Sequence, residues 1–351
     1  MRPASVPSPA TLGLTRPTAA DDLARLGWDN AESLDLLWTL AAAGDPDLAL
    51  NTLMRIFEGA PEIGPALRED ETFRVRLIAL LGGSSAFGDH LAANPDAWQE
   101  LQRALPTPTE MLHTLLTTIG AEPASFAEQP ERPDTASDDL TTPGTYRAEP
   151  GDHKAQLKTV YRTLMMRIAA HDLAGTFHSR KGQSRPQPRV GFREVTRLTT
   201  ALADAALTAA LASAVRAVFG DDPLDAQLAV IAMGKCGAGE LNYISDVDVI
   251  FVGSEATPRV TRVASEFNRI GSACFFEVDA NLRPEGKSGA LVRTLDSHIA
   301  YYKRWAETWE FQAQLKARPQ TGYMPLGQNY VDSIGPMVWT CLLYTSPSPR
   351  D

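Results

Sequence analysis

Two short apolar runs separated by a glycine-rich turn are the most constraining feature of this chain. Residues 228–233 and 247–252 each have the length and composition of a buried strand. The turn GKCGAG (residues 234–239) lies between them, and the second run begins with Asp246 and Asp248. Residues two apart on a strand face the same side with backbones about 7 Å apart, so the two carboxylates can converge on divalent cations about 3.5–4 Å apart. Two acids beside a buried strand are costly unless a cation neutralises them, and this cost predicts a metal-dependent site.

A third acid and several basic residues extend this pattern. Asp279 lies in FFEVDANL, which we expect to be another strand, and it completes the predicted metal site. Glycine-rich turns let backbone N–H groups approach phosphate oxygens, and Lys235 can add positive charge there. Arg283 and Lys287 can each neutralise a phosphate, with a solvated turn as the alternative for Lys287. The candidate catalytic and metal-binding residues are Asp246, Asp248 and Asp279, and the candidates for nucleotide or phosphate binding are Gly234, Lys235, Gly237, Gly239, Ser245, Arg283 and Lys287.

Taken in order, these motifs resemble those of the nucleotidyltransferase superfamily. An Asp-x-Asp alone is common in surface loops, and the glycine turn does not have the Walker A spacing. Three longer stretches narrow the resemblance to the bifunctional glutamine synthetase adenylyltransferase/adenylyl-removing family: GKCGAGELNYISDVDVIFV, VDANLRPEGKSGALVRT and YYKRWAETWEFQAQLKARP. The resemblance runs from about residue 21 to residue 339. It implies an α+β fold, in which an N-terminal helical region precedes a nucleotidyltransferase domain with a small mixed β-sheet flanked by helices.

The resemblance also implies a function. The helical segment before the first motif indicates the amino-terminal unit of the family, which removes AMP from adenylyl-tyrosine of glutamine synthetase by phosphorolysis and so regulates nitrogen assimilation. Its implied cofactor is Mg²⁺, and its partners are glutamine synthetase, ADP or ATP, phosphate and, in a full-length chain, a PII-type signal protein. Two alternatives remain open. One is ATP-dependent adenylylation of glutamine synthetase, and the other is a non-catalytic module that senses nucleotide or a signal protein.

Composition excludes several other classes of protein. The 351 residues carry a net charge of −10, which argues against nucleic acid, because binding a phosphate backbone demands a basic surface. The three cysteines are too scattered for a disulfide framework or a metal site. There is no apolar run approaching 18 residues and no signal peptide at the start, so we expect a soluble, cytoplasmic protein without a membrane partner.

Shifts in composition predict the organisation of the chain. Residues 1–19 are rich in Pro, Ser and Thr and are expected to be disordered. The remaining segments are a helical region (20–105), a Pro-rich acidic linker or loop (106–152), helices that pack on the catalytic domain (153–226), the nucleotidyltransferase domain (227–320), the start of a truncated helical region (321–340) and a non-native tail (341–351).

Local patterns give further expectations within these segments. The segment FFEVDANL and residues 290–294 are expected to form a hairpin, and residues 298–319 to form one amphipathic helix. Packing against the sheet is the favoured role of Tyr301, Trp305 and Trp309 on that helix, with nucleobase stacking as the alternative. Arg318 is expected to face the site. We interpret His90, His113 and His171 as structural. The basic segment 178–189 is expected to be a solvated loop, with contact to a phosphate or an acidic partner as its alternative.

Overall fold

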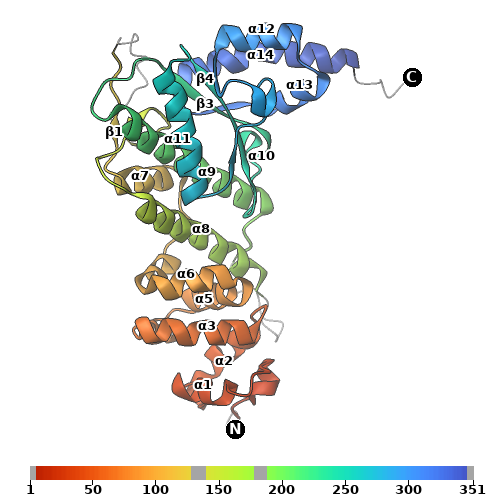
Figure 1. Ribbon diagram of the computed structural model, residues 1–351. Coiled ribbons are helices and arrows are strands. Elements are labelled where there is room, and N and C mark those ends of the chain that lie inside the picture. The colour runs from red at the N-terminus through yellow and green to blue at the C-terminus, as the bar shows by residue number, and fades with distance from the viewer. Residues whose placement is uncertain (1–4, 128–139, 178–187, 346–351) are drawn as a thin grey trace. The chain divides into compact units, whose positions relative to one another are not determined.

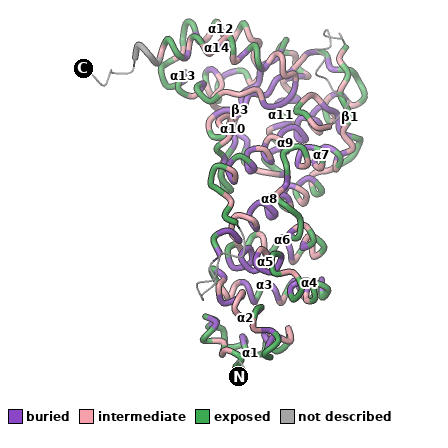
Figure 2. The backbone as a smooth tube through the Cα atoms, turned by 180° about the vertical axis from the view of Figure 1, so that it is seen from behind, coloured by how far each residue is buried: buried purple, intermediate pink, exposed green. Residues whose placement is uncertain are grey.

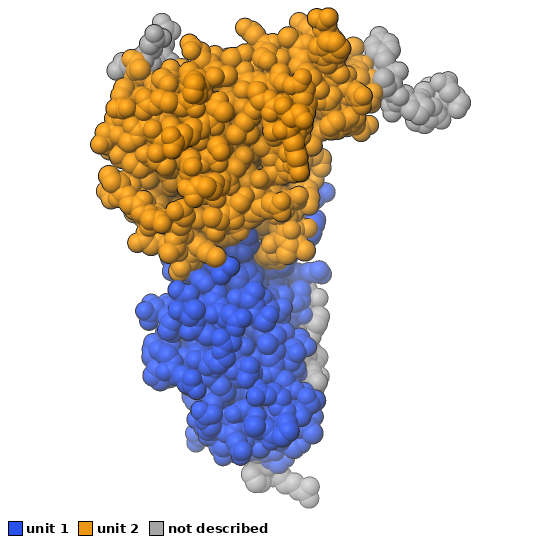
Figure 3. All heavy atoms as spheres, in the orientation of Figure 1, with its two compact units in different colours: residues 1–106, 162–195 blue, residues 107–161, 196–351 orange. Residues whose placement is uncertain are grey.

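The computed structural model describes residues 5–127, 140–177 and 188–345 (Figure 1). The chain divides into two compact units, coloured separately in Figure 3. Unit 1 comprises Met1–Pro106 and Arg162–Val195, and unit 2 comprises Thr107–Tyr161 and Thr196–Asp351. The chain passes between the units three times: first between Pro106 and Thr107, and then inside two long helices, α8 (Lys154–Thr176) and α9 (Phe192–Phe219). The expected α+β class is confirmed, since helices flank a small mixed sheet.

Unit 1 is helical, and polar caps set where its helices begin. The side chains of Asp45, Asp70 and Ser84 each accept a backbone N–H bond at the start of the helix that follows, which satisfies a donor that the helix itself leaves unpaired. Its helices before α8 are η1 (Pro9–Leu12), α1 (Ala19–Arg25), η2 (Ala31–Ser33), α2 (Leu34–Ala41), α3 (Pro46–Gly59), α4 (Ile63–Glu69), α5 (Glu71–Gly83), α6 (Ser85–Ala93) and η3 (Pro95–Gln102). Buried positions recur along α3 and α5, where the core of the unit lies (Figure 2).

The expected disorder of residues 1–19 is wrong for the part that the structure describes. Ser8 caps η1, and Leu12 at the end of that short helix is fully buried. The Thr15 hydroxyl donates a hydrogen bond to the Asp47 carboxylate of α3, which connects the segment to the helical core. The Pro, Ser and Thr residues that indicated disorder serve instead as a helix start and as hydrogen-bonding groups.

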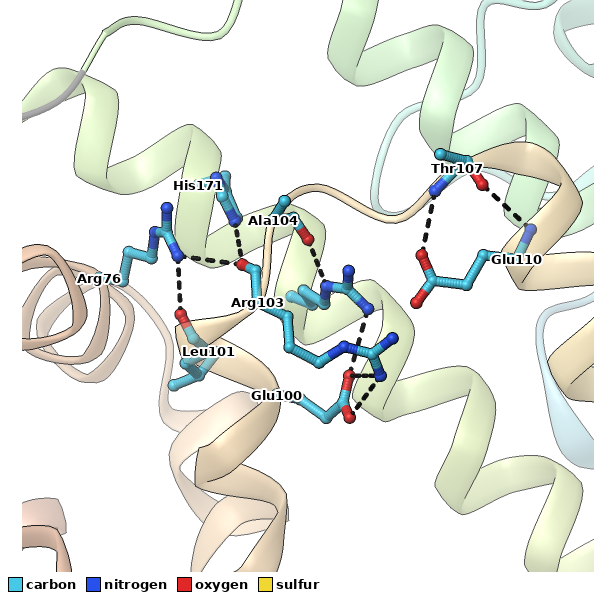
Figure 4. Close-up of polar contacts among 9 residues, drawn as sticks. Arg76, Glu100, Leu101, Arg103, Ala104, Thr107, Glu110 and His171 are labelled. Carbon is cyan, nitrogen blue, oxygen red and sulfur yellow. Dashed lines mark hydrogen bonds and ion pairs between the residues drawn. The ribbon is translucent and has the colours of Figure 1, made fainter. Parts of the chain in front are cut away.

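Histidine and arginine side chains in unit 1 satisfy backbone carbonyls (Figure 4). His171 Nε2 donates to the Arg103 carbonyl oxygen at 3.0 Å, and Arg76 donates to the carbonyls of Leu101 and Arg103. Burial lowers the pKa of His171 to about 4, so this imidazole is neutral at pH 7. These contacts agree with the structural interpretation of His171, and His90 likewise lies 2.9 Å from the hydroxyl of Thr163.

The linker expected over residues 106–152 contains regular structure, so that prediction is wrong for its described parts. Thr107 and Glu110 form a capping box that starts α7 (Pro108–Thr118), drawn in Figure 4. Proline is favourable at the first position of a helix, as Pro108 is here. The repeated prolines of this segment were the reason that a linker was predicted. After α7, β1 (Glu122–Pro123) pairs antiparallel with β2 (Tyr146–Arg147). Residues 128–139, and most of the basic segment 178–189, lie outside the described residues.

A mixed sheet of five strands is the centre of unit 2. Its strands are β3 (Leu228–Ala232), β4 (Val247–Gly253), β5 (Val278–Asp279), β6 (Val292–Thr294) and β7 (Arg318–Gly322). Strand β3 runs antiparallel to β4 and β7, whereas β5 and β6 both run parallel to β4 along the same edge. The expected hairpin is therefore wrong. Two strands that share one direction need a connection that leaves the sheet and returns, and this connection contains η4 (Gly286–Ser288).

Helices cover both faces of this sheet (Figure 1). On one face lie α12 (Leu295–Arg304), α13 (Thr308–Gln314) and α14 (Met324–Thr345), whose buried aromatic residues pack on Ile231 and Ile250. On the other face lie α9 and α11 (Pro258–Cys274), and Phe251 of β4 meets Phe267 of α11 edge to face at 5.4 Å. By length and composition α9 could cross a membrane, but 72% of its most apolar window is buried inside the fold.

The single helix expected over residues 298–319 is two helices and a strand. Helix α12 ends at Arg304, and Glu307 begins α13 through a capping box with Glu310. This break turns two tryptophans outward, since Trp305 and Trp309 are 65% and 53% exposed. The expectation that they pack against the sheet is wrong. Neighbouring Tyr302, which the sequence pattern did not single out, fills that position instead.

Candidate functional site

The glycine-rich segment after β3 is a short helix, α10 (Gly234–Ala238), and not an open turn. Gly234 has φ +53°, and a Cβ built there would stand 2.9 Å from Oδ2 of Asp248. Gly237 lies so close to the backbone before β7 that its Cβ would stand 1.9 Å from the Lys316 carbonyl oxygen. Gly239, with φ +73°, ends the helix. These glycines permit close contacts of backbone and carboxylate that other residues would block.

Lys235 of α10 reaches the loop that leads to the acids. Its Nζ lies 3.2 Å from Oγ of Ser245 and 3.9 Å from Oδ1 of Asp246. Asn242 shapes this loop, because its Oδ1 accepts hydrogen bonds from the Ser245 hydroxyl at 2.8 Å and from the Ile244 N–H at 3.1 Å. The structure therefore brings Lys235, Ser245 and Asp246 together at one point next to β4.

The three predicted acids lie on adjacent strands. Asp246 is exposed just before β4, Asp248 is half-buried within β4, and Asp279 is its partner in register on β5. Burial raises the pKa of Asp248, and the negative charges of Asp246 and Asp279 raise it further, against the opposing charge of Lys235. The Oδ1 atom of Asp279 accepts the N–H of Asn281 at 2.7 Å. The three carboxylates therefore repel one another electrostatically.

The chemistry of these residues fits a divalent cation. Carboxylate oxygens are the ligands that Mg²⁺ prefers, and a cation beside Asp248 would offset the repulsion that raises its pKa. The three side chains are neighbours without closing on one point: within the described ranges, no group of three His, Cys, Asp or Glu side chains is arranged to hold a metal ion. Binding Mg²⁺ through all three acids would require their carboxylates to come closer together.

Arg283 and Lys287 lie in the connection between β5 and β6. The Arg283 guanidinium donates to the backbone carbonyls of Ala280, Lys287 and Gly289, at 2.7, 3.0 and 3.0 Å, so it folds this connection. The side chain of Lys287 is exposed on η4. Their predicted contact with phosphate stays a prediction, and the observed role of Arg283 is to shape the backbone that follows Asp279.

Asp204 is a residue of this region that the sequence analysis missed. It lies on α9 and forms an ion pair with Arg318 of β7, with Nη2 and Oδ1 2.9 Å apart. Arg318 was expected to face the site; from β7 it binds Asp204 of α9 and two backbone carbonyls of α10. The signal was present in the sequence, because Asp204 is the one acidic residue inside the alanine-rich part of the segment 192–219. A charge on an otherwise apolar helix indicates a buried partner.

Comparison with known proteins identifies relatives of this chain. Residues 75–332 match the model of the glutamate-ammonia ligase adenylyltransferase family. Three relatives are each named bifunctional glutamine synthetase adenylyltransferase/adenylyl-removing enzyme. Those from Corynebacterium efficiens and Corynebacterium glutamicum are 58% and 55% identical over 95% of this chain and 33% of their own length. The one from Nocardia farcinica is 52% identical over 96% of this chain and 32% of its own length. The chain thus spans about a third of the length of these curated relatives.

Proposed function

Because this chain belongs to the glutamate-ammonia ligase adenylyltransferase family, we propose that it removes AMP from an adenylylated tyrosine of glutamine synthetase by phosphorolysis. The observation that carries the proposal is the packing of α10 against the acids. Gly234 lies against the Asp248 carboxylate, and Lys235 reaches Ser245 and Asp246. A basic residue and a close-packed glycine beside paired acids suit the binding of phosphate and its metal ion.

In the proposed reaction, an oxygen of inorganic phosphate attacks the phosphorus of the AMP–tyrosine phosphodiester. The new P–O bond gives ADP, and the bond to the tyrosine oxygen breaks, so that the phenolate leaves and takes up a proton. Mg²⁺, held by Asp246, Asp248 and Asp279, would supply positive charge to the transferring phosphoryl group. Lys235 and the backbone of α10 bind phosphate oxygens and orient them for in-line displacement.

The proposal also specifies the direction of AMP transfer, which is removal and not attachment. The same residues serve removal and attachment equally well, because both reactions pass through the same phosphoryl centre. The order of elements within the chain supports removal: a helical unit precedes one glycine-helix and Asp-x-Asp unit, as the resemblance implies for the removing unit. The soluble substrates of the reaction lead us to propose a cytoplasmic location as well.

One experiment compares both directions in the same sample. Adenylylated glutamine synthetase is incubated with the chain, Mg²⁺ and phosphate, and ADP release is followed. Unmodified glutamine synthetase is incubated in parallel with labelled ATP, and label on the protein is followed. We expect ADP release to exceed labelling. Labelling that outpaces release would identify an attaching unit, and a well-folded chain that does neither while binding nucleotide would identify a sensing module.

A further inference from the structure

The side chain of Arg318 forms hydrogen bonds to the last turn of α10. Arg318 lies on β7 opposite Ala232 of β3, the strand that leads into α10. Its Nε donates to the Gly237 carbonyl at 3.2 Å, and its Nη2 donates to the Cys236 carbonyl at 3.1 Å. Carbonyl oxygens in the last turn of a helix lack full intrahelical partners. The planar guanidinium of Arg318 supplies hydrogen bonds to two of them.

Asp204 orients that guanidinium. Its Oδ1 accepts a hydrogen bond from Nη2 of Arg318 at 2.9 Å. The same oxygen lies 3.9 Å from the sulfur of Cys236, which is buried in α10. Burial raises the pKa of Asp204, while the Arg318 charge opposes that shift. Gln320, two residues further along β7, donates to the backbone carbonyl of Asp204 at 2.7 Å. The pair therefore joins α9, β7 and α10 through a partly buried, hydrogen-bonded contact.

The first residues of α10 carry the groups assigned to catalysis. Gly234, at its first position, contacts the Asp248 carboxylate, and Lys235 reaches toward Asp246. The helix has only five residues and cannot keep its position by its own hydrogen bonds. Its position relative to the acids therefore depends on its neighbours: the Met233 N–H, just before the helix, donates to the Asp248 carbonyl, and Arg318 binds the carbonyls of its last turn.

We propose that Asp204 and Arg318 are a positioning pair for the site: they fix α10 so that Lys235 keeps its place relative to Asp246 and Asp248. Neither member of the pair touches the reacting atoms in this assignment. The inference rests on the proposed function, which supplies the role of the groups that α10 carries. A displacement of about 1 Å at a site of this kind can cost on the order of 100-fold in rate.

The test compares Arg318→Lys and Asp204→Asn with a matched control, Arg216→Lys. Lysine keeps the charge of Arg318 but cannot serve the Asp204 carboxylate and two carbonyls at once. Arg216, also in unit 2, pairs with the Asp221 carboxylate and donates to a backbone carbonyl, but it does not contact α10. Three measurements are made: hydrogen–deuterium exchange of peptides, calorimetric binding of Mg–ADP, and kcat and KM for phosphorolysis.

We expect faster exchange confined to the peptide that covers residues 233–246, in both test variants and not in Arg216→Lys. Mg–ADP binding should weaken about tenfold or more and kcat should fall, while KM for glutamine synthetase stays unchanged, because only the reacting groups have moved. Unchanged exchange in that peptide would overturn the inference, as would faster exchange throughout unit 2, which indicates a general role in stability. If the parent chain binds no Mg–ADP, the proposed function fails, and the exchange pattern alone still decides the positioning role.

Discussion

The Asp248 carboxylate occupies the space that a side chain on Gly234 would fill. A Cβ at position 234 would stand 2.9 Å from Oδ2 of Asp248, and the glycine has a φ of +53° that other residues adopt only with strain. The backbone at this point is also tied to the acid, because the N–H of Met233 donates to the Asp248 carbonyl at 2.9 Å. The end of β3 and the half-buried acid of β4 therefore form one structural unit.

This contact predicts that Gly234→Ala impairs the site more than the fold. The left-handed backbone should cost roughly 1–2 kcal/mol of unfolding free energy, and the added methyl group should displace the Asp248 carboxylate. We expect phosphorolysis to fall about 10- to 100-fold. Urea unfolding measures the first effect, and ADP release measures the second.

Gly220→Ala is the matched control for this prediction. Gly220 has a similar φ of +57°, but a Cβ there would meet no described atom within 4 Å. It should lose stability to about the same degree and keep full activity. Equal activity in the two variants would show that the contact between Gly234 and Asp248 has no functional role.

The clustering of acids predicts that replacing Asp246 and Asp248 together by Asn leaves the fold intact. Without Mg²⁺ the double variant should melt at the same temperature as the parent or higher, because the repulsion that acts on Asp248 is gone. The parent should gain thermal stability on addition of Mg²⁺ and the variant should not. The claim of metal binding would be refuted by a double variant that gains as much from Mg²⁺ as the parent does.

Buried His298 predicts a loss of stability in acid. Burial lowers its pKa to about 4, against about 6.5 in an unfolded chain, so between these values the unfolded state binds more protons than the folded state. Stability due to His298 is therefore complete above pH 6.5 and falls as the pH drops toward 4. The ring packs among Tyr302 and Tyr330, and His298→Phe keeps such contacts without a titrating group.

We expect His298→Phe to reduce the slope of unfolding free energy against pH between 4 and 6.5 by up to about 1.4 kcal/mol per pH unit. Part of the slope should remain, since burial also lowers the pKa of His171 to about 4. A slope that is identical in His298→Phe and the parent would contradict the burial of a neutral imidazole.

The order found in the N-terminal segment predicts a stability effect at Leu12. This side chain is fully buried, so Leu12→Ala should cost about 2–5 kcal/mol of unfolding free energy. Val6 is 39% exposed, and Val6→Ala should change stability by less than about 0.5 kcal/mol. Denaturant unfolding of both variants distinguishes a packed segment from a disordered one, for which neither change would matter.

Much of the site could be predicted because its motifs are local. The apolar runs around GKCGAG, with Asp246 just before β4 and Asp248 within it, define a strand, a connection and a strand within 25 residues, and no distant information is needed. The third acid could be placed on a strand, and the structure pairs Asp279 directly with Asp248. The α+β class was implied by the family resemblance that these motifs carry.

What could not be predicted depended on contacts between distant segments. The pair of Asp204 and Arg318 joins residues that are far apart in sequence, and periodicity carries no information about such partners. The parallel pairing of β5 and β6 with β4 is likewise a matter of topology, and a hairpin is the simpler local reading. The break between α12 and α13 depends on the capping box of Glu307. The helical spacing of Tyr301, Trp305 and Trp309 had predicted one continuous helix across this break.

Phosphate-dependent release of ADP from adenylylated glutamine synthetase is the most direct test of the central claim, that the acids beside α10 form an AMP-transferring site. The assay compares the parent chain with Asp279→Asn, in which an amide oxygen can still accept the Asn281 N–H. We predict ADP release by the parent with Mg²⁺, and loss of release in Asp279→Asn at unchanged helix content. Release by the variant at the parental rate, or none by a well-folded parent, would contradict the account.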